Sequence, residues 1–220
     1  RVRARGSHGE IARRSHSLIF RQLQDPVSHT YTYILADDRT CHAVIVDPVR
    51  EQAPRDLKLL DELRLKLVYI LETHVHADHV TGANALKGVT GAQTGVSLHC
   101  GATGFDRLLD DGMTVEFGGE SLRVIATPGH TPGSSCFLWH DRLLTGDTLL
   151  IGGCGRTDFQ QGDAGTLYDS ITQRLFTLPD DTLVYPGHDY KGRHVSTIAE
   201  ERATNPRLAG RSRDQFIEIM

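Results

Sequence analysis

The chain has 220 residues, of which 39% are hydrophobic, and a formal net charge of -4, which suits one globular domain with a full core. Its 24 basic residues are outnumbered by 28 acidic ones, so the composition offers no broad basic surface for nucleic acid. No apolar run approaches the roughly 18 residues that a membrane-spanning helix needs.

Residues 1–17 differ in composition from the rest of the chain. They carry five arginines against a single acid, Glu10, and lack hydrophobic periodicity. The segment Arg5-Gly6-Ser7-His8 is typical of an expression-tag remnant, whereas an Arg- and Ser-rich, acid-poor start also fits the end of an organelle transit peptide. A disordered extension is the third interpretation. We therefore expect one folded domain over residues 18–220.

The next segments predict a strand pair, a helix and a buried strand. Residues 31–35 alternate apolar and polar side chains, and residues 43–46 are apolar after the turn-prone Asp37-Asp38, which predicts an antiparallel pair. Leucines at near-helical spacing predict a helix over 54–65. The continuous apolar run 67–71 is typical of an interior strand covered on both faces of an α/β structure.

The second half of the chain continues with short strands and two helices. Strands are predicted at 95–98, 113–117, 121–126, 136–139 and 143–145, with a last apolar stretch at 183–185. Helices are predicted at 165–178 and 197–204. Four of these strands end in a loop with histidine or aspartate, at 73–79, 127–130, 146–147 and 187–189. Loops held by rigid strand ends are where functional sites are built.

The first of these loops is dense in metal-capable side chains. His74, His76, Asp78 and His79 lie within six residues, and their spacing differs from the i, i+4 pair of a helical zinc protease motif. Neutral imidazoles bind zinc, iron or copper, and a carboxylate adds charge. We therefore predict a loop around metal, with His130, Asp147 and His188 completing one or two coordination spheres. The alternative is a solvated polar loop.

The four cysteines are Cys41, Cys100, Cys136 and Cys154, and they are widely spaced with no Cys-x-x-Cys pair. This spacing favours reduced thiols in an intracellular compartment over a disulfide framework or a zinc ribbon.

Taken in order, Thr73-His74-Val75-His76-Ala77-Asp78-His79, Pro128-Gly129-His130, Gly146-Asp147 and Pro186-Gly187-His188 resemble the metallo-β-lactamase superfamily from about residue 18 onward. The resemblance implies an α/β fold, a four-layer αββα sandwich with the metal site at one edge of the two sheets. Three segments, 74–82, 149–162 and 185–190, look like the persulfide dioxygenases, also called sulfur dioxygenases or ethylmalonic encephalopathy proteins. The segment 149–162 is the most discriminating.

This resemblance implies an iron enzyme. His74, His130 and Asp147 match the positions that hold a single Fe(II), one per chain, and a facial set of two histidines and a carboxylate leaves positions open for a persulfide sulfur and dioxygen. Glutathione persulfide would be oxidised to sulfite and glutathione, and the sulfur would supply every electron, so no nicotinamide or flavin is expected. A homodimer is expected, in the bacterial cytoplasm or, as the alternative, in the mitochondrial matrix.

The remaining polar residues leave alternatives open. In hydrolytic relatives, such as glyoxalase II-like hydroxyacylglutathione thioester hydrolases, His76, Asp78, His79 and His188 would complete a dinuclear site. In the dioxygenases the same four would orient ligands and bound water. A metal-binding relative without catalysis is a third class.

Four further side chains are assigned roles around the cavity. Arg156 is expected to form a forked pair with a carboxylate of glutathione, or else an ordinary salt bridge within its loop. Tyr190 is expected to hydrogen-bond substrate or cover the site, and Cys154 to line the cavity or to be a small buried thiol. Asp47 is expected to brace the histidine loop.

Overall fold

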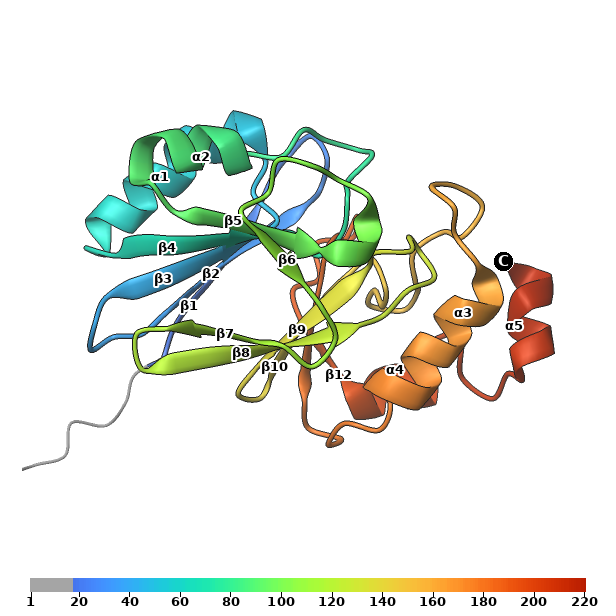
Figure 1. Ribbon diagram of the computed structural model, residues 1–220. Coiled ribbons are helices and arrows are strands. Elements are labelled where there is room, and N and C mark those ends of the chain that lie inside the picture. The colour runs from blue at the N-terminus through green and yellow to red at the C-terminus, as the bar shows by residue number, and fades with distance from the viewer. Residues whose placement is uncertain (1–17) are drawn as a thin grey trace, which may run out of the picture.

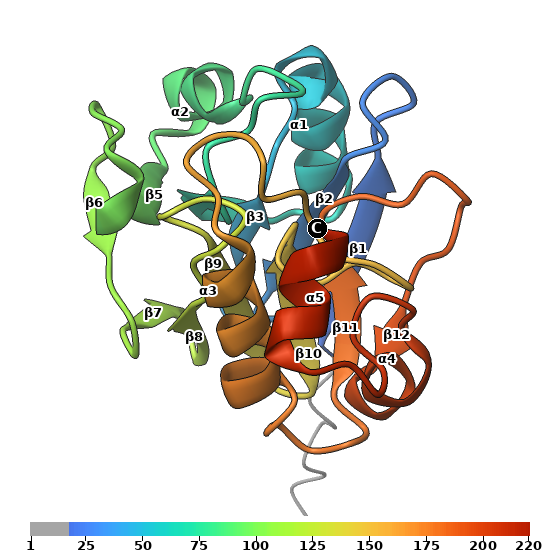
Figure 2. The same cartoon turned by 90° about the vertical axis from the view of Figure 1, so that its right-hand side faces the viewer.

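The computed structural model describes residues 18–220, so the predictions for residues 1–17 lie outside the described residues. Two six-stranded sheets pack against each other (Figure 1), and helices cover the outer face of each. The view turned by 90° shows the helices on either side of the paired sheets (Figure 2). The αββα sandwich predicted from the sequence is confirmed.

The first sheet has the strand order β1-β2-β3-β4-β5-β6. Its strands are β1 (Ile19–Gln24), β2 (Tyr31–Ala36), β3 (His42–Val46), β4 (Lys66–Leu71), β5 (Gln93–Ser97) and β6 (Arg107–Leu109). The first three are antiparallel neighbours, whereas β3 through β6 run parallel. Parallel neighbours need a crossover, and helices α1 (Ala53–Glu62) and α2 (Ala83–Thr90) provide the first two.

The second sheet has the order β12-β11-β10-β9-β8-β7. Its strands are β7 (Thr114–Phe117), β8 (Glu120–Ala126), β9 (Ser135–Trp139), β10 (Arg142–Gly146), β11 (Leu183–Pro186) and β12 (Ser196–Thr197). All neighbours are antiparallel except β10 and β11, which are parallel. Helices α3 (Ala164–Asp169), α4 (Ile198–Thr204) and α5 (Arg213–Ile219) follow in chain order, and a π-helical turn (Ser170–Leu175) extends α3.

Most predicted elements are present within a few residues of the predicted bounds. The helix predicted over 165–178 is α-helical only to Asp169 and continues as the π-helical turn to Leu175. The sequence prediction missed β1, α2, β6, β12 and α5. The run at β4 is indeed an interior strand, because β3 and β5 lie on its two sides. No helix within residues 18–220 is both long and apolar enough to cross a membrane.

Apolar side chains form three layers of core that hold the sheets and helices rigid. Between the sheets, Tyr33, Leu71, Phe137 and Trp139 are buried in one cluster. A second cluster joins the first sheet to α1 and α2, and a third joins the second sheet to the C-terminal helices. Because β3 and β4 are parallel neighbours, their C-terminal ends lie at one edge, and the same holds for β10 and β11. The loops that follow these four ends therefore start from fixed positions.

Asp56 in α1 gives a test of the packing beneath that helix. Its side chain is fully buried, with Oδ1 2.9 Å from Arg55 Nη2 and Oδ2 without a hydrogen bond. Burial raises the pKa of Asp56 from 3.8 to about 6, against the opposing charge of Arg55. Since the folded-state pKa lies above the unfolded one, the stabilisation is present at low pH and is lost as the pH rises through this window.

We therefore expect wild-type protein to become less stable, relative to Asp56→Asn, by about 1–3 kcal/mol between pH 4 and pH 7. Urea unfolding of both proteins across that range measures the difference. A difference that stays constant with pH would contradict a buried carboxyl at this position.

Candidate metal centre

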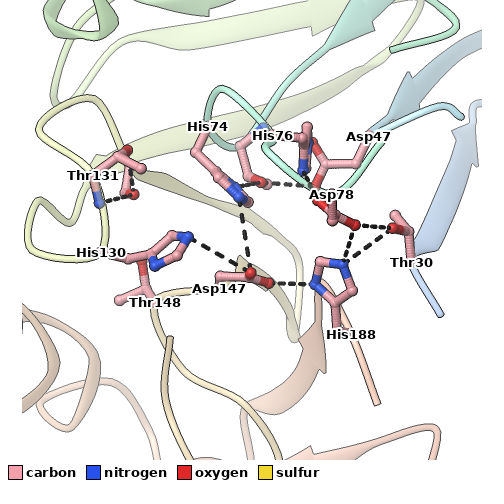
Figure 3. A network of polar contacts seen from close by, with 12 residues as sticks. Thr30, Asp47, His74, His76, Asp78, His130, Thr131, Asp147, Thr148 and His188 are labelled. Carbon is pink, nitrogen blue, oxygen red and sulfur yellow. Dashed lines mark hydrogen bonds and ion pairs between the residues drawn. The ribbon is translucent and has the colours of Figure 1, made fainter. Parts of the chain in front are cut away.

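The strand-end loops meet around a cavity of about 480 Å³. His74 follows β4, His130 follows β8, Asp147 follows β10 and His188 follows β11, and all four line this cavity. Figure 3 shows these side chains pointing toward one another. The structure therefore brings together the histidine and aspartate loops singled out from the sequence.

Three of these side chains form a candidate metal-binding group. Asp147 Oδ2 lies 3.9 Å from His74 Nε2 and 3.7 Å from His130 Nε2, and the potential ligand atoms of the three residues all lie within 4.8 Å of one another. His74 and His130 are buried, with 2% and 7% of their surface exposed. Two imidazole nitrogens and one carboxylate oxygen thus converge on one point.

Hydrogen bonds fix the tautomers of both histidines. His130 Nδ1 lies 2.7 Å from the carbonyl oxygen of Arg156, and because a carbonyl only accepts, Nδ1 carries the hydrogen. The Thr73 hydroxyl donates to Asp47 Oδ2 at 2.7 Å, so toward His74 Nδ1, 2.9 Å away, it acts as acceptor. Each ring therefore presents the lone pair of Nε2 to the cavity, which is the form that binds a metal.

The charge states of the group also suit a cation. Burial, with the nearby charge of His76, lowers the pKa of His74 to about 3, so this ring is neutral at pH 7. Burial acts to raise the pKa of Asp147, but the hydrogen bond and charge of His188 outweigh it and hold that pKa below its ordinary value. The centre thus offers the neutral imidazole of His74 and the carboxylate anion of Asp147, beside the Nε2 atom of His130.

His188 lies between two carboxylates. Its Nδ1 is 2.7 Å from Asp147 Oδ1 and its Nε2 is 2.8 Å from Asp78 Oδ2, with Thr30 Oγ1 3.1 Å away (Figure 3). Burial opposes protonation, yet the two carboxylates raise the pKa of His188 to about 10. A ring that donates from both nitrogens orients Asp147 and offers no lone pair of its own.

The remaining histidines of the loop lie deeper. His76 Nε2 is 3.0 Å from Asp47 Oδ1 and 3.3 Å from Glu72 Oε2, and His79 Nδ1 is 3.1 Å from Asp78 Oδ2. His76 Nδ1 and His79 Nε2 are buried without a hydrogen bond. Potential ligand atoms of His76, Asp78 and His79 lie within 4.8 Å of one another, so this second group can hold a cation as well.

Asp47 braces the histidine loop as predicted. Its carboxylate accepts hydrogen bonds from the Thr73 backbone N–H and the Thr73 hydroxyl, each at 2.7 Å, and contacts His76 Nε2 at 3.0 Å. The residue is 1% exposed and has a left-handed backbone, with φ of 53°. It therefore joins the ends of β3 and β4 and fixes where the loop begins.

The residues assigned to substrate lie around the cavity mouth. Arg156 forms the salt bridge within its own loop, with Nε 2.7 Å from Asp158 Oδ1 and its guanidinium over the Phe159 ring. Tyr190 is 71% exposed and its ring is stacked at 6.2 Å from that of His188. Cys154 lines the cavity, and burial raises the pKa of its thiol to about 11.

Two residues of the site were missed in the sequence. Thr30, before β2, lies 3.1 Å from Asp78 Oδ2, and nothing in its sequence neighbourhood signals this contact across 48 positions. Glu72 is 2% exposed and lies 3.3 Å from His76. An acidic residue that ends an apolar strand directly before the histidine motif was a signal that could have found it.

Comparisons with known proteins agree with this geometry. Residues 25–188 match the family described as the metallo-beta-lactamase superfamily. The chain is 50% identical over 206 residues to the mitochondrial persulfide dioxygenase ETHE1 of Homo sapiens, covering 92% of this chain and 80% of the human protein. The crystal structure of ETHE1 from Myxococcus xanthus superimposes with a TM-score of 0.90 at 54% identity, covering 91% of this chain and 89% of that one.

A relative that is named as a glyoxylase is less similar in sequence. Glyoxylase B2 of Dictyostelium discoideum is 31% identical over 232 residues, covering 87% of this chain and 79% of that protein. The chain is thus more similar in sequence to the human persulfide dioxygenase, at 50% identity, than to this glyoxylase, at 31% identity.

Proposed function

Since the chain belongs to the persulfide dioxygenase branch of the metallo-β-lactamase superfamily, we propose that it oxidises a persulfide with dioxygen at the centre formed by His74, His130 and Asp147. The observation that carries this proposal is the convergence of two Nε2 lone pairs and one carboxylate on an open cavity. The identity to the human relative supports the same reaction.

The fold and the clustered His and Asp side chains support a metal cofactor, and we propose that it is a single Fe(II). Two imidazoles and one carboxylate with open positions beside them are typical of non-haem iron oxygenases. Bound there, ferrous iron would supply the redox chemistry that dioxygen needs. His74 and His130 would hold it through Nε2 and Asp147 through Oδ2, while His188 keeps the other Asp147 oxygen in a hydrogen bond.

The cavity wall is suited to bind the persulfide. Leu150, Phe159 and Tyr190 give it apolar surface next to the proposed ligands. Asp158 engages Nε and Nη2 of Arg156, while Nη1 makes no hydrogen bond within residues 18–220. We assign this free side of the guanidinium to a carboxylate of glutathione as the persulfide carrier.

The overall reaction balances without a further reductant. Glutathione persulfide, dioxygen and water give glutathione, sulfite and two protons. This balance includes no separate electron donor. The outer sulfur is oxidised and gives up as many electrons as dioxygen accepts, and the bond between the two sulfurs breaks. A chain without a reductase partner can therefore complete the cycle.

A thioester hydrolase is the second candidate. The observation that favours it is the group His76, Asp78 and His79, which could hold the second ion of a dinuclear centre. Against it stand the hydrogen bonds that engage His188 on both ring nitrogens and the lower identity to the glyoxylase relative.

One preparation tests the two candidates together. Given glutathione persulfide in air, iron-loaded protein should consume oxygen and release sulfite without added reductant, because the sulfur supplies the electrons, and an iron chelator should stop the uptake. Thioester hydrolysis of S-lactoylglutathione should be slow or absent, since one metal lacks the bridging hydroxide of a dinuclear site. An oxygen electrode and a thioester absorbance assay measure the two rates. Hydrolysis without persulfide-dependent oxygen uptake would refute the proposal.

Domain organisation, oligomeric state and compartment complete the proposal. We assign residues 18–220 to one domain and the active species to a homodimer. We place the chain in the bacterial cytoplasm, with the mitochondrial matrix as the alternative, and the name of the human relative as mitochondrial supports that alternative.

A further inference from the structure

The loop from Leu150 to Arg156 lies directly against two of the proposed ligands. Gly155 N donates to the Asp147 backbone oxygen at 2.7 Å, and the Arg156 carbonyl accepts from His130 Nδ1 at 2.7 Å. A Cβ atom on Gly155 would lie 2.3 Å from that Asp147 oxygen and 2.7 Å from His130 Nδ1, so no side chain fits between them. A displacement of this loop would therefore change the positions of His130 and Asp147.

The middle of this loop is held by Glu201 of α4 and by Asn205, the residue that follows α4, and neither residue lines the cavity. Glu201 Oε2 accepts from Gly152 N at 2.9 Å and from Asn205 Nδ2 at 2.8 Å, and Glu201 Oε1 accepts from Ser196 Oγ at 2.7 Å. Asn205 Nδ2 also donates to Gly153 O at 3.0 Å. Glu201 is 2% exposed and Asn205 is 0% exposed, so water does not compete for these bonds.

A second anchor reaches the same loop from its exposed side. Arg193 Nη2 donates to Ile151 O at 2.8 Å and pairs with Asp189, the residue after His188. The Arg193 side chain is 42% exposed, although its partner Asp189 is buried, so water competes for the Arg193 bonds more than for those of Glu201 and Asn205. The buried anchor through Glu201 is therefore the stronger of the two.

We propose that Glu201 is a positioning residue for the metal centre, acting through Gly152 and Gly155 on the orientation of His130 and Asp147. It neither lines the cavity nor contacts the proposed ligands, and it reaches them through the loop that it holds. The inference rests on the proposed function in one respect, the assignment of His130 and Asp147 as ligands. It adds a determinant of metal retention that lies on a different element from every ligand.

Two substitutions of equal length separate the hydrogen-bonding role of Glu201 from its packing. Glu201→Met keeps the volume and removes both acceptors. Glu201→Gln keeps an oxygen that can accept from Gly152 and Asn205, while its amide donates to Ser196 Oγ, so this conservative change should preserve the anchor.

A buried glutamate far from the site supplies the matched control. Glu120, at the start of β8, is 8% exposed and accepts from Trp139 Nε1 and His140 Nε2. Glu120→Met removes a buried acceptor of the same kind at the opposite end of that strand from His130, and so reports the cost of destabilisation alone.

The test measures ferrous iron retention against a chelator under anaerobic conditions, and hydrogen exchange of the amides in residues 150–156. We expect Glu201→Met to release iron at about tenfold lower chelator, at the low end of the 10–100-fold range for groups that orient ligands, with faster exchange at Gly152 and Gly155. Glu201→Gln should match wild type, and Glu120→Met should keep its iron. Under turnover, Glu201→Met should also raise KM for glutathione persulfide more than Glu120→Met does.

Equal iron loss in the two Met variants, or none in Glu201→Met, would overturn the positioning role. If Glu201→Met does not fold, Asn205→Ala removes the bond to Gly153 O and should give the same loss of protection and of iron. Absence of oxygen uptake in every protein would refute the dioxygenase function, while iron retention and amide exchange would still decide the role of Glu201.

Discussion

Replacing His74, His130 or Asp147 by Ala should abolish stoichiometric iron binding and persulfide-dependent oxygen uptake, whereas His188→Ala should keep most of the iron. Each of the first three side chains supplies one of the converging ligand atoms, and two ligands cannot hold the ion against water. His188 instead donates to Asp147 and Asp78, so its loss should reduce turnover by about 10–100-fold.

Metal analysis of anaerobically prepared proteins, with oxygen uptake on the same samples, measures both effects. Wild-type protein should contain about one iron per chain, in line with a facial set of three ligands. Equal iron loss in all four variants would make His188 a direct ligand. A second, equally occupied ion at Asp78, His79 and His188 would favour the hydrolase.

The parts of the fold that could be predicted are those whose pattern is local. The continuous apolar run of β4 predicts an interior strand because both of its faces are covered by the same molecule. In contrast, β1 lies at the edge of its sheet and most of its residues are only partly buried, so its alternation is weak. Helix α2 has eight residues with Gly88 in its second half, and its position is determined by packing on the first sheet.

The same limit applies to the site. Metal-capable residues could be located because each follows a strand, and the ends of β10 and β11 are adjacent because these strands are parallel neighbours. Contacts between distant segments were not visible: Thr30 reaches His188 across 158 positions, and Glu201 reaches Gly152 across 49. Arg156 forms the salt bridge within its own loop, because Asp158 is two residues away and both side chains are exposed.

Asp47 gives the second large effect, because it determines both the stability of the loop and the tautomer of His74. Asp47→Ala leaves the Thr73 N–H and the Thr73 hydroxyl without their buried acceptor, and leaves His76 Nε2 with Glu72 as its one remaining carboxylate partner among residues 18–220. It also places Ala at a φ of 53°. We expect the free energy of unfolding to fall by about 3–5 kcal/mol, as for other broken buried pairs. Urea unfolding of the metal-free proteins measures it.

Asp47→Asn separates the two roles. Asn tolerates the left-handed backbone and keeps the volume. However, its NH2 group replaces one of the two carboxylate oxygens, so it faces either the Thr73 N–H or the Thr73 hydroxyl, and both of these groups donate to Asp47 in the wild type. With the amide facing the hydroxyl, Thr73 Oγ1 must donate to His74 Nδ1, which moves the ring hydrogen to Nε2 and removes the lone pair that faces Asp147. Asp47→Asn should thus unfold at higher urea than Asp47→Ala and yet bind iron about 10–100-fold more weakly than wild type. Wild-type iron affinity in Asp47→Asn would show that the Asp47–Thr73–His74 chain does not set the tautomer, and that His74 is oriented by packing alone.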